Sequence, residues 1–262
     1  MGNCAGKALD LRRYDTSPVT PITKDVVPAN DKKTESETSK PQPMIFALMR
    51  NGHEVIRGAM RDLNEFIENE DMQASKELWE KLMKWSAMHM KMEEGNGSEE
   101  SPVGFFHLLD KNFDKIVTKA GLSDSHHILE DMEEITTKAF ADGDIAAVKS
   151  AYKSYEETNL EHLEKEEKIM MPKVMAMKKM GLPLKKYMQE ELLATIIETP
   201  DFEFFVKFAN EMLERHPEGM PRVRVFDHAL WAVSTPEQWG VYDKWIKETI
   251  SEKSYQELQA VL

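Results

Sequence analysis

The sequence predicts an all-α protein: an antiparallel four-helix bundle in up-down-up-down order, preceded by a disordered tail and followed by a helical extension. The first observation is composition, because the 262 residues include only 12 Gly and 12 Pro but 18 Met, with abundant Leu, Glu, Lys and Ala. These residue types favour helices over sheets. The second observation is four successive long segments whose apolar residues recur at helical spacing, which is typical of a bundle.

Charge and cysteine content exclude several classes of function. With 34 basic and 47 acidic residues the net charge is −13, so a nucleic-acid backbone is not an expected partner. The single cysteine, Cys4, excludes an internal disulfide framework and a thiolate metal cluster. No stretch approaches the roughly 18 apolar residues that span a bilayer, and we expect no secretory leader because no apolar leader-like region follows Met1. We expect a cytoplasmic protein unless a lipid anchor attaches it to a membrane.

The N-terminus carries a candidate anchor in residues 1–42. Removal of Met1 exposes Gly2, the acceptor for N-myristoylation, and Cys4 is a nearby candidate for palmitoylation. Stable membrane attachment requires two such signals. Gly6 departs from the motif, which prefers Ser or Thr, and the alternative is an unmodified flexible tail. Residues 15–42 are rich in Thr, Ser, Pro, Lys and Asp, which predicts a disordered linker that leads from the cytoplasmic face of a membrane.

The four bundle helices are expected within residues 43–180. The first covers 43–68, with Pro43 at its first position, and the second covers 71–94. A longer connection with Pro102 and a group of apolar residues follows. The third begins near Ser123 or Ser125, either of which is a suitable cap, and ends at 142, while the fourth covers 144–180. The apolar faces of these helices predict one buried core.

Residues 181–262 form the predicted helical extension. Thr199-Pro200-Asp201 and Thr235-Pro236-Glu237 are typical helix starts with proline at the first position. Pro217, Gly219 and Pro221 divide the region into short helices. We expect these helices to pack on the bundle or to present a surface to a protein partner.

Four of the eight histidines have nearly even spacing, with one on each predicted bundle helix. They are His53, His89, His126 and His162, with gaps of 36, 37 and 36 residues. Because successive helices reverse direction, near-equal gaps bring the four side chains to a similar height in the bundle. His126 is closer than its neighbour His127 to the apolar face of the third helix.

Three of these histidines have a glutamate four residues later, which are the pairs His89–Glu93, His126–Glu130 and His162–Glu166. Residues at i and i+4 project from the same helix face. The apolar face is clearest on the second and fourth helices, so their pairs, His89–Glu93 and His162–Glu166, are the main candidates. Four imidazoles and two carboxylates exceed the three protein ligands of a catalytic zinc and suit two iron ions, with oxo, hydroxo or water ligands completing the coordination. The alternative is a set of buried neutral histidines, since such pairs also arise by chance.

Three segments resemble the signatures of the hemerythrin-like, or HHE, domain family. They are His162-Leu-Glu-Lys-Glu-Glu-Lys-Ile-Met-Met-Pro172, His89-Met-Lys-Met-Glu93-Glu94 and His53-Glu54-Val-Ile-Arg57. The resemblance covers about residues 43–180. It implies a non-heme di-iron centre that reacts with dioxygen, with Glu93 and Glu166 as bridges and His53, His89, His126 and His162 as terminal ligands.

The third helix departs from the pattern of the oxygen-carrying hemerythrins. Those proteins use five histidines, two of them four residues apart on that helix, and here the position four residues after His126 is Glu130, so the fifth imidazole is missing. Either Glu130 substitutes for it or the iron keeps an extra solvent site. The site is more similar to the iron- and oxygen-responsive domain of an F-box protein. We therefore expect dioxygen binding or the sensing of oxygen or iron. The alternatives are a di-iron oxidase or peroxidase-like enzyme and a metal-free, lipid-anchored helical interaction module.

Overall fold

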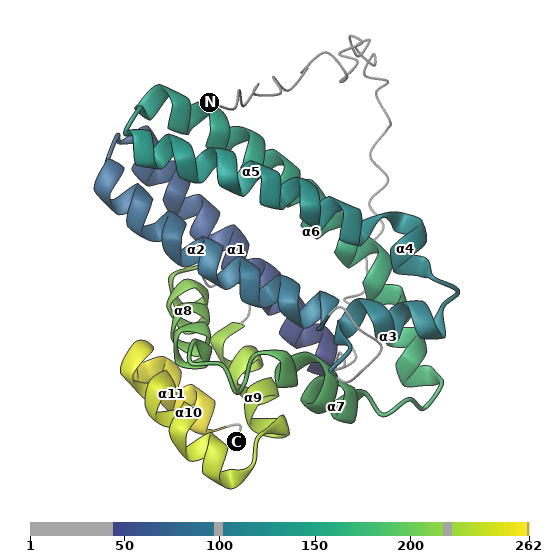
Figure 1. Ribbon diagram of the computed structural model, residues 1–262. Helices are drawn as coiled ribbons and strands as arrows, with labels where there is room; N and C mark the ends of the chain where they lie inside the picture. Colours follow the sequence, from purple (N-terminus) through teal and green to yellow (C-terminus); the bar gives the residue numbers. More distant parts are fainter. Residues whose placement is uncertain (1–43, 97–101, 217–221, 261) are drawn as a thin grey trace, which may run out of the picture. The chain divides into compact units, whose positions relative to one another are not determined.

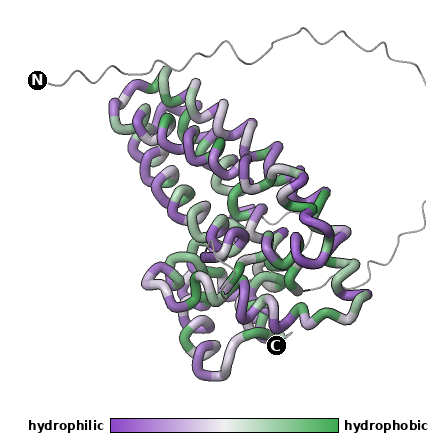
Figure 2. The backbone as a smooth tube through the Cα atoms, turned by 45° about the vertical axis from the view of Figure 1, so that its right-hand side comes forward, coloured by the Kyte–Doolittle hydropathy of each residue, from purple (hydrophilic) through white to green (hydrophobic). Residues whose placement is uncertain are grey.

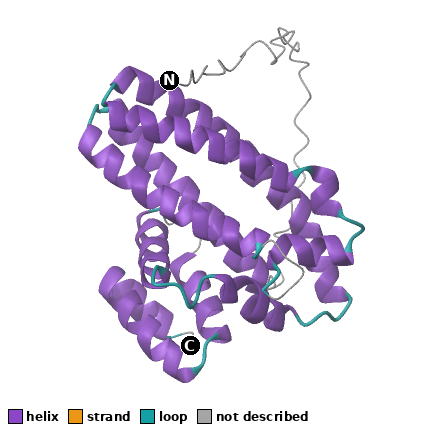
Figure 3. Cartoon of the chain, in the orientation of Figure 1, coloured by secondary structure: helices purple, strands orange, loops and turns teal. Residues whose placement is uncertain are grey.

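The computed structural model describes residues 44–96, 102–216, 222–260 and 262. The described residues belong to one compact unit. The predicted acylation of Gly2 and Cys4, the predicted disordered tail and the helix start at Pro43 lie outside the described residues. Every regular element in the described ranges is a helix, which confirms the all-α prediction for this part of the chain (Figure 3). None of the described helices is both long enough and apolar enough to cross a membrane.

Four long helices carry the residues of interest (Figure 1). They are α1 (Met44–Glu68), α2 (Met72–Glu94), α5 (Leu122–Asp142) and α6 (Ile145–Lys179). Their bounds lie within a few residues of the predicted ones. α1 packs against α2 and α6, α5 packs against α6, and α2 packs against α5. Hydrophilic and hydrophobic residues alternate along these helices, as amphipathic packing requires (Figure 2).

Large aromatic side chains fill the core between these helices. Trp79 of α2 meets Tyr155 of α6 edge to face, with 4.9 Å between the ring centroids. Tyr152 donates its hydroxyl hydrogen to the Met60 carbonyl over 2.9 Å, so this buried phenol keeps a partner. Burial of each such side chain stabilises the fold by about 1.5–3 kcal/mol. The core therefore fixes the rotation of α2 and α6, the two helices that carry both a histidine and a glutamate of the predicted site.

The start of α5 differs from the prediction. Gly121 precedes the helix with φ of 63°, a left-handed conformation that glycine adopts without steric cost, and no side chain caps the helix. The expectation that Ser123 or Ser125 caps this helix is therefore wrong. Both serines lie inside α5, and Ser125 donates its hydroxyl hydrogen to the Leu122 carbonyl over 2.5 Å. This leaves the Ser125 oxygen free to accept a hydrogen bond from elsewhere.

The connection after α2 contains two helices that the sequence analysis did not predict, α3 (Gly104–Asn112) and α4 (Ile116–Ala120). Buried Phe105, Phe106, Leu108 and Leu109 lie on α3, which packs against α2. Gly95 and Gly104 touch through their backbones, and a Cβ on Gly95 would lie 2.3 Å from the Val103 carbonyl carbon. Two glycines are thus required where the chain closes over the end of α2.

The remaining helices are α7 (Leu184–Tyr187), a π-helix (Met188–Leu192), a 3₁₀ helix (Leu193–Thr195), α8 (Phe202–Arg215), α9 (Arg222–Val233), α10 (Pro236–Thr249) and α11 (Glu252–Gln259). Those up to α9 contact α1 or α2, whereas α10 packs on α8 and α11 packs on α9 and α10. α10 begins at Pro236 with a capping box between Thr235 and Gln238, as predicted. α8 instead begins at Phe202, so Pro200 is not its first residue. Phe205 of α8 stacks on Trp85 of α2, with 4.1 Å between the ring centroids.

Candidate metal centre

Six buried polar side chains from the four long helices converge in the core. α1 contributes His53, α2 contributes His89 and Glu93, α5 contributes His126, and α6 contributes His162 and Glu166. The fractional exposure of these residues is 5% or less. The cost of placing a carboxylate in such an interior is high unless a cation or hydrogen bonds compensate for it. The cluster therefore requires a physical explanation.

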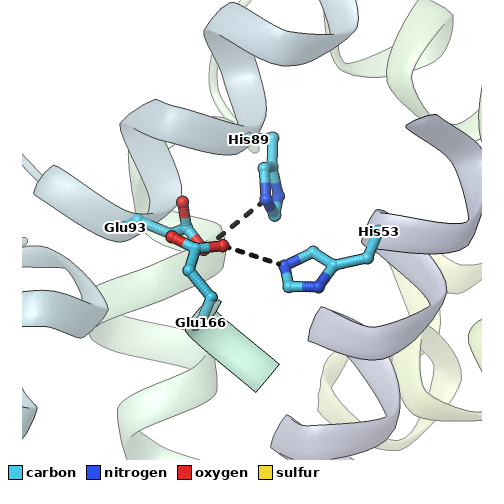
Figure 4. Close-up of side chains that lie close together, drawn as sticks. All are labelled: His53, His89, Glu93 and Glu166. Atoms are coloured by element: carbon cyan, nitrogen blue, oxygen red, sulfur yellow. Dashed lines mark ion pairs between the residues drawn. The ribbon is translucent and has the colours of Figure 1, made fainter. Parts of the chain in front are cut away.

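The six residues form two groups of four, each with ligand atoms within 4.8 Å of one another. The first group is His53, His89, Glu93 and Glu166, and the second is Glu93, His126, His162 and Glu166. Figure 4 shows the first group, in which the four side chains point toward a common space. Both groups contain the same two glutamates. The arrangement therefore offers two adjacent positions for a cation, each with two imidazoles and two shared carboxylates.

Each shared carboxylate contacts at least one histidine of each group. Glu166 Oε2 lies 3.3 Å from His53 Nε2, and Glu166 Oε1 lies 3.0 Å from His162 Nε2. Glu93 Oε1 lies 3.5 Å from His89 Nε2, and Glu93 Oε2 lies 3.4 Å from His126 Nε2. The two oxygens of a single carboxylate thus face different positions. This is the geometry that a bridging carboxylate needs.

Most of these facing atoms lack hydrogen bonds. The Nε2 atoms of His53 and His89 and all four oxygens of Glu93 and Glu166 have no hydrogen-bond partner among the described residues. A buried polar atom without a partner costs about 1–3 kcal/mol. Imidazole nitrogen and carboxylate oxygen together suit divalent transition metals such as iron. The unpartnered atoms therefore fit two metal ions.

Outer contacts turn the Nε2 atoms of three histidines toward the centre. His53 Nδ1 lies 2.9 Å from Glu167 Oε1, and His126 Nδ1 lies 2.8 Å from Glu94 Oε1. His162 Nδ1 lies 2.8 Å from Ser125 Oγ. Because the Ser125 hydrogen is donated to a backbone carbonyl, Ser125 accepts from the His162 Nδ1–H, which leaves the Nε2 lone pair for a metal. Such contacts commonly orient metal-bound histidines.

The sequence patterns above did not predict this outer layer of Glu94, Ser125 and Glu167. Arg57 belongs to it too, since its guanidinium donates to Glu167 over 2.7 Å and to Glu54 over 2.9 Å. The adjacent glutamate in each Glu-Glu pair was a usable signal for Glu94 and Glu167. No local pattern marks Ser125, because its partner is 37 residues away on another helix.

Charges inside the cluster shift the proton affinities of its members. Burial opposes the charged form of His53, but contacts with Glu166 and Glu167 outweigh it and raise the pKa to about 9. Burial also opposes charge on His126, yet Glu166, Glu93 and Glu94 raise its pKa to about 12. Burial alone would raise the pKa of Glu166, whereas three histidines hold it well below its usual range. Metal binding therefore has to displace protons from the imidazoles.

His127 and Glu130, the other two ligand candidates on α5, lie outside both groups. The side chain of His127 is 79% exposed and that of Glu130 is 57% exposed, and the two pair with each other over 3.2 Å. His126 is therefore the histidine that α5 contributes to the cluster. In this arrangement Glu130 does not replace the fifth imidazole of the oxygen-carrying hemerythrins.

A mainly apolar cavity reaches the first group of four. It encloses about 10 Å³ that is open to the centre of a water-sized molecule, close to the minimum for one such molecule. The lining residues come from α1 and α2, from α3 and from the C-terminal helices. They are Leu48, Met49, Gly52, His89, Met92, Glu93, Phe105, Leu192, Phe205 and Phe226. A small uncharged molecule suits this space better than an ion does.

No known protein family, curated protein or solved structure matches this chain. The interpretation of the centre therefore depends on the chemistry of its own side chains.

Proposed function

We propose that this protein is a hemerythrin-like, non-heme di-iron protein that binds dioxygen or senses oxygen or iron. The observation that carries the proposal is the presence of Glu93 and Glu166 in both groups of four. A single catalytic zinc ion needs only three protein ligands, whereas this cluster presents four imidazoles and two carboxylates. Two ions that share the glutamates use every one of these side chains.

The proposed architecture around the ions is an antiparallel four-helix bundle of α1, α2, α5 and α6. In support, each of these helices packs against at least one of the others, and short turns join α1 to α2 and α5 to α6. Short connections favour antiparallel neighbours. In this arrangement the bundle supplies ligands from all four helices at one level.

The choice of iron and dioxygen rests on donor type and on the cavity. Mixed imidazole and carboxylate ligands are typical of non-heme iron sites, and bound ferrous ions would supply the electrons and open positions with which dioxygen reacts. The apolar cavity ends on His89 and Glu93 and suits a small uncharged molecule. The packed helices hold the ligand side chains in place, and the apolar lining of the cavity limits the water that reaches the first group of four.

Metal content and the visible absorption spectrum of aerobically purified protein test the proposal. We expect about two irons per chain, as in other di-iron bundles, and absorption bands typical of a di-iron centre. Glu166→Ala should lose the iron, while the exposed Glu164→Ala, two residues away, should retain it. Absence of iron after anaerobic ferrous loading and exposure to air would overturn the proposal. Steady oxygen consumption with a reductant would assign an oxidase instead.

We also propose that acylation at Gly2 and Cys4 attaches the protein to the cytoplasmic face of a membrane. The glycine after Met1 and the nearby cysteine supply the two signals that stable attachment needs. Intact mass after co-expression with an N-myristoyltransferase should show one added myristoyl group, and Gly2→Ala should abolish it. An unmodified mass under those conditions would contradict the proposal.

A further inference from the structure

A second, polar pocket reaches the centre from a different face of α2. It lies between α2 and α5 and provides about 420 Å³ that is open to the centre of a water-sized molecule. Its polar lining comprises Lys91, Glu94, Ser123, His126, His127 and Glu130. At about 100° per residue, Lys91 and Glu94 point away from His89 and Glu93, which line the apolar cavity. The centre thus has two approaches, a narrow apolar cavity and a wider polar pocket.

His126 connects this pocket with the second group of four. Its Nδ1 faces Glu94 at the pocket wall over 2.8 Å, and its Nε2 lies 3.4 Å from Glu93 inside the centre. The carboxylate of Glu93 is 2% exposed and has no hydrogen-bond partner in the described part of the chain. A cation that reaches His126 from the pocket is therefore next to a buried carboxylate whose oxygens have no hydrogen bond to the described residues.

The two approaches differ in what they can admit. A divalent cation would have to lose its water in the narrow apolar cavity, which is costly. The polar pocket is wide enough for an ion that keeps its water molecules, and the carboxylates of Glu94 and Glu130 offer such an ion oxygen contacts. Lys91 and His126 are the basic groups that face these carboxylates. Because charges at the mouth of a site set the rate at which charged ligands associate, reversal of one of them should change the rate of cation entry.

We propose that the pocket between α2 and α5 is the entry site through which a hydrated divalent cation reaches the His126–His162 half of the centre. Glu130 and His127 act there as transient contacts and not as permanent ligands. This inference rests on the proposed metal-binding function and adds a route to it. It also gives a role to the exposed pair that the ligand cluster leaves out.

The rate of metal uptake tests this route. Metal-free full-length protein is mixed anaerobically with excess ferrous ion or cobalt(II), and uptake is followed by stopped-flow absorption. Glu130→Lys should slow uptake about 3- to 10-fold and Lys91→Glu should accelerate it by a similar factor, as expected for a change of two charges near a divalent ion at moderate salt. Added salt should reduce the wild-type rate more than the Glu130→Lys rate. The final metal content should be unchanged in both variants.

Glu80→Lys is the matched control, because this exposed residue lies on α2 about 21 Å along the helix axis from Glu94. Equal uptake rates in Glu130→Lys, Lys91→Glu and Glu80→Lys would overturn the entry site while leaving the di-iron proposal intact. A lower final metal content in Glu130→Lys would also overturn it, because Glu130 would then be a ligand. Failure of wild-type protein to bind either metal would overturn both proposals.

Discussion

Replacement of Glu93 by methionine should have opposite effects on the metal-free and metal-loaded proteins. Both oxygens of this carboxylate are buried without hydrogen bonds to any described residue. Methionine has a similar size and contains no group that needs a hydrogen-bond partner. The substitution therefore removes the cost of a buried carboxylate from the metal-free protein, and it removes a proposed bridging ligand from the metal-loaded protein.

The magnitude follows from the local charge balance. Two buried oxygens without partners cost about 2–6 kcal/mol at about 1–3 kcal/mol each, and the lost attraction to His89 and His126 offsets part of that gain. The remaining acids still outnumber the nearby cations, so no cation is left without an acidic partner. The four acids are Glu54, Glu94, Glu166 and Glu167, and the three cations are Arg57, His53 and His126. We expect a net gain of about 1–3 kcal/mol for the metal-free protein, or about 2–10 °C in Tm.

Thermal unfolding with a chelator and with added ferrous ion measures both effects. Wild-type protein at a free metal concentration of about 100 Kd should gain about 2.7 kcal/mol, and Glu93→Met should lose most of that gain. Glu80→Met, an exposed substitution on the same helix, should change neither the stability of the metal-free protein nor the stability gained on metal binding. A metal-free Glu93→Met protein less stable than wild type, or one with the full metal-induced shift, would refute the reasoning.

Three further predictions concern the histidine choice, the outer contacts and pH. His126→Ala should lose about half of the iron and the exposed His127→Ala none; equal losses in iron assays would contradict the assignment. Glu167→Gln should weaken iron binding about 10- to 100-fold without a change in stoichiometry, because it removes a charge that orients His53; chelator competition measures this, and unchanged affinity would contradict it. Burial, with Asp243 nearby, raises the pKa of Asp227 from 3.8 to about 8. Between about pH 4 and pH 8 the folded state therefore holds a proton on Asp227 that the unfolded chain has lost. The stability that this proton contributes is fully present below about pH 4 and is lost as the pH rises to about 8. In urea unfolding, the free energy of unfolding of the wild-type protein should fall by about 1.4 kcal/mol per pH unit over this range, and Asp227→Asn should make that fall less steep. Parallel pH profiles for the two proteins would contradict this prediction.

Local patterns predicted the helices and the main ligand candidates. Apolar spacing placed the four long helices within a few residues of their observed bounds, because helix periodicity is a property of neighbouring residues. The pairs His89–Glu93 and His162–Glu166 followed from the same geometry, since residues at i and i+4 share a face in any helix. The helical segments α3 and α4 were missed because their apolar residues lie in a connection with several helix-breaking residues.

Tertiary structure decided what these residues do together. His53 and Glu166 are more than a hundred residues apart in the chain, and their 3.3 Å contact depends on how α1 and α6 are rotated about their axes. That rotation is set by the packing of large side chains such as Trp79 and Tyr155. The same packing buries His126 and leaves His127 in solvent. The sequence alone thus determined helices that carry histidines and glutamates at regular intervals, because those intervals are local. Only the packed core made Glu93 and Glu166 common to two groups, since a shared ligand requires four helices to fix one another's orientation.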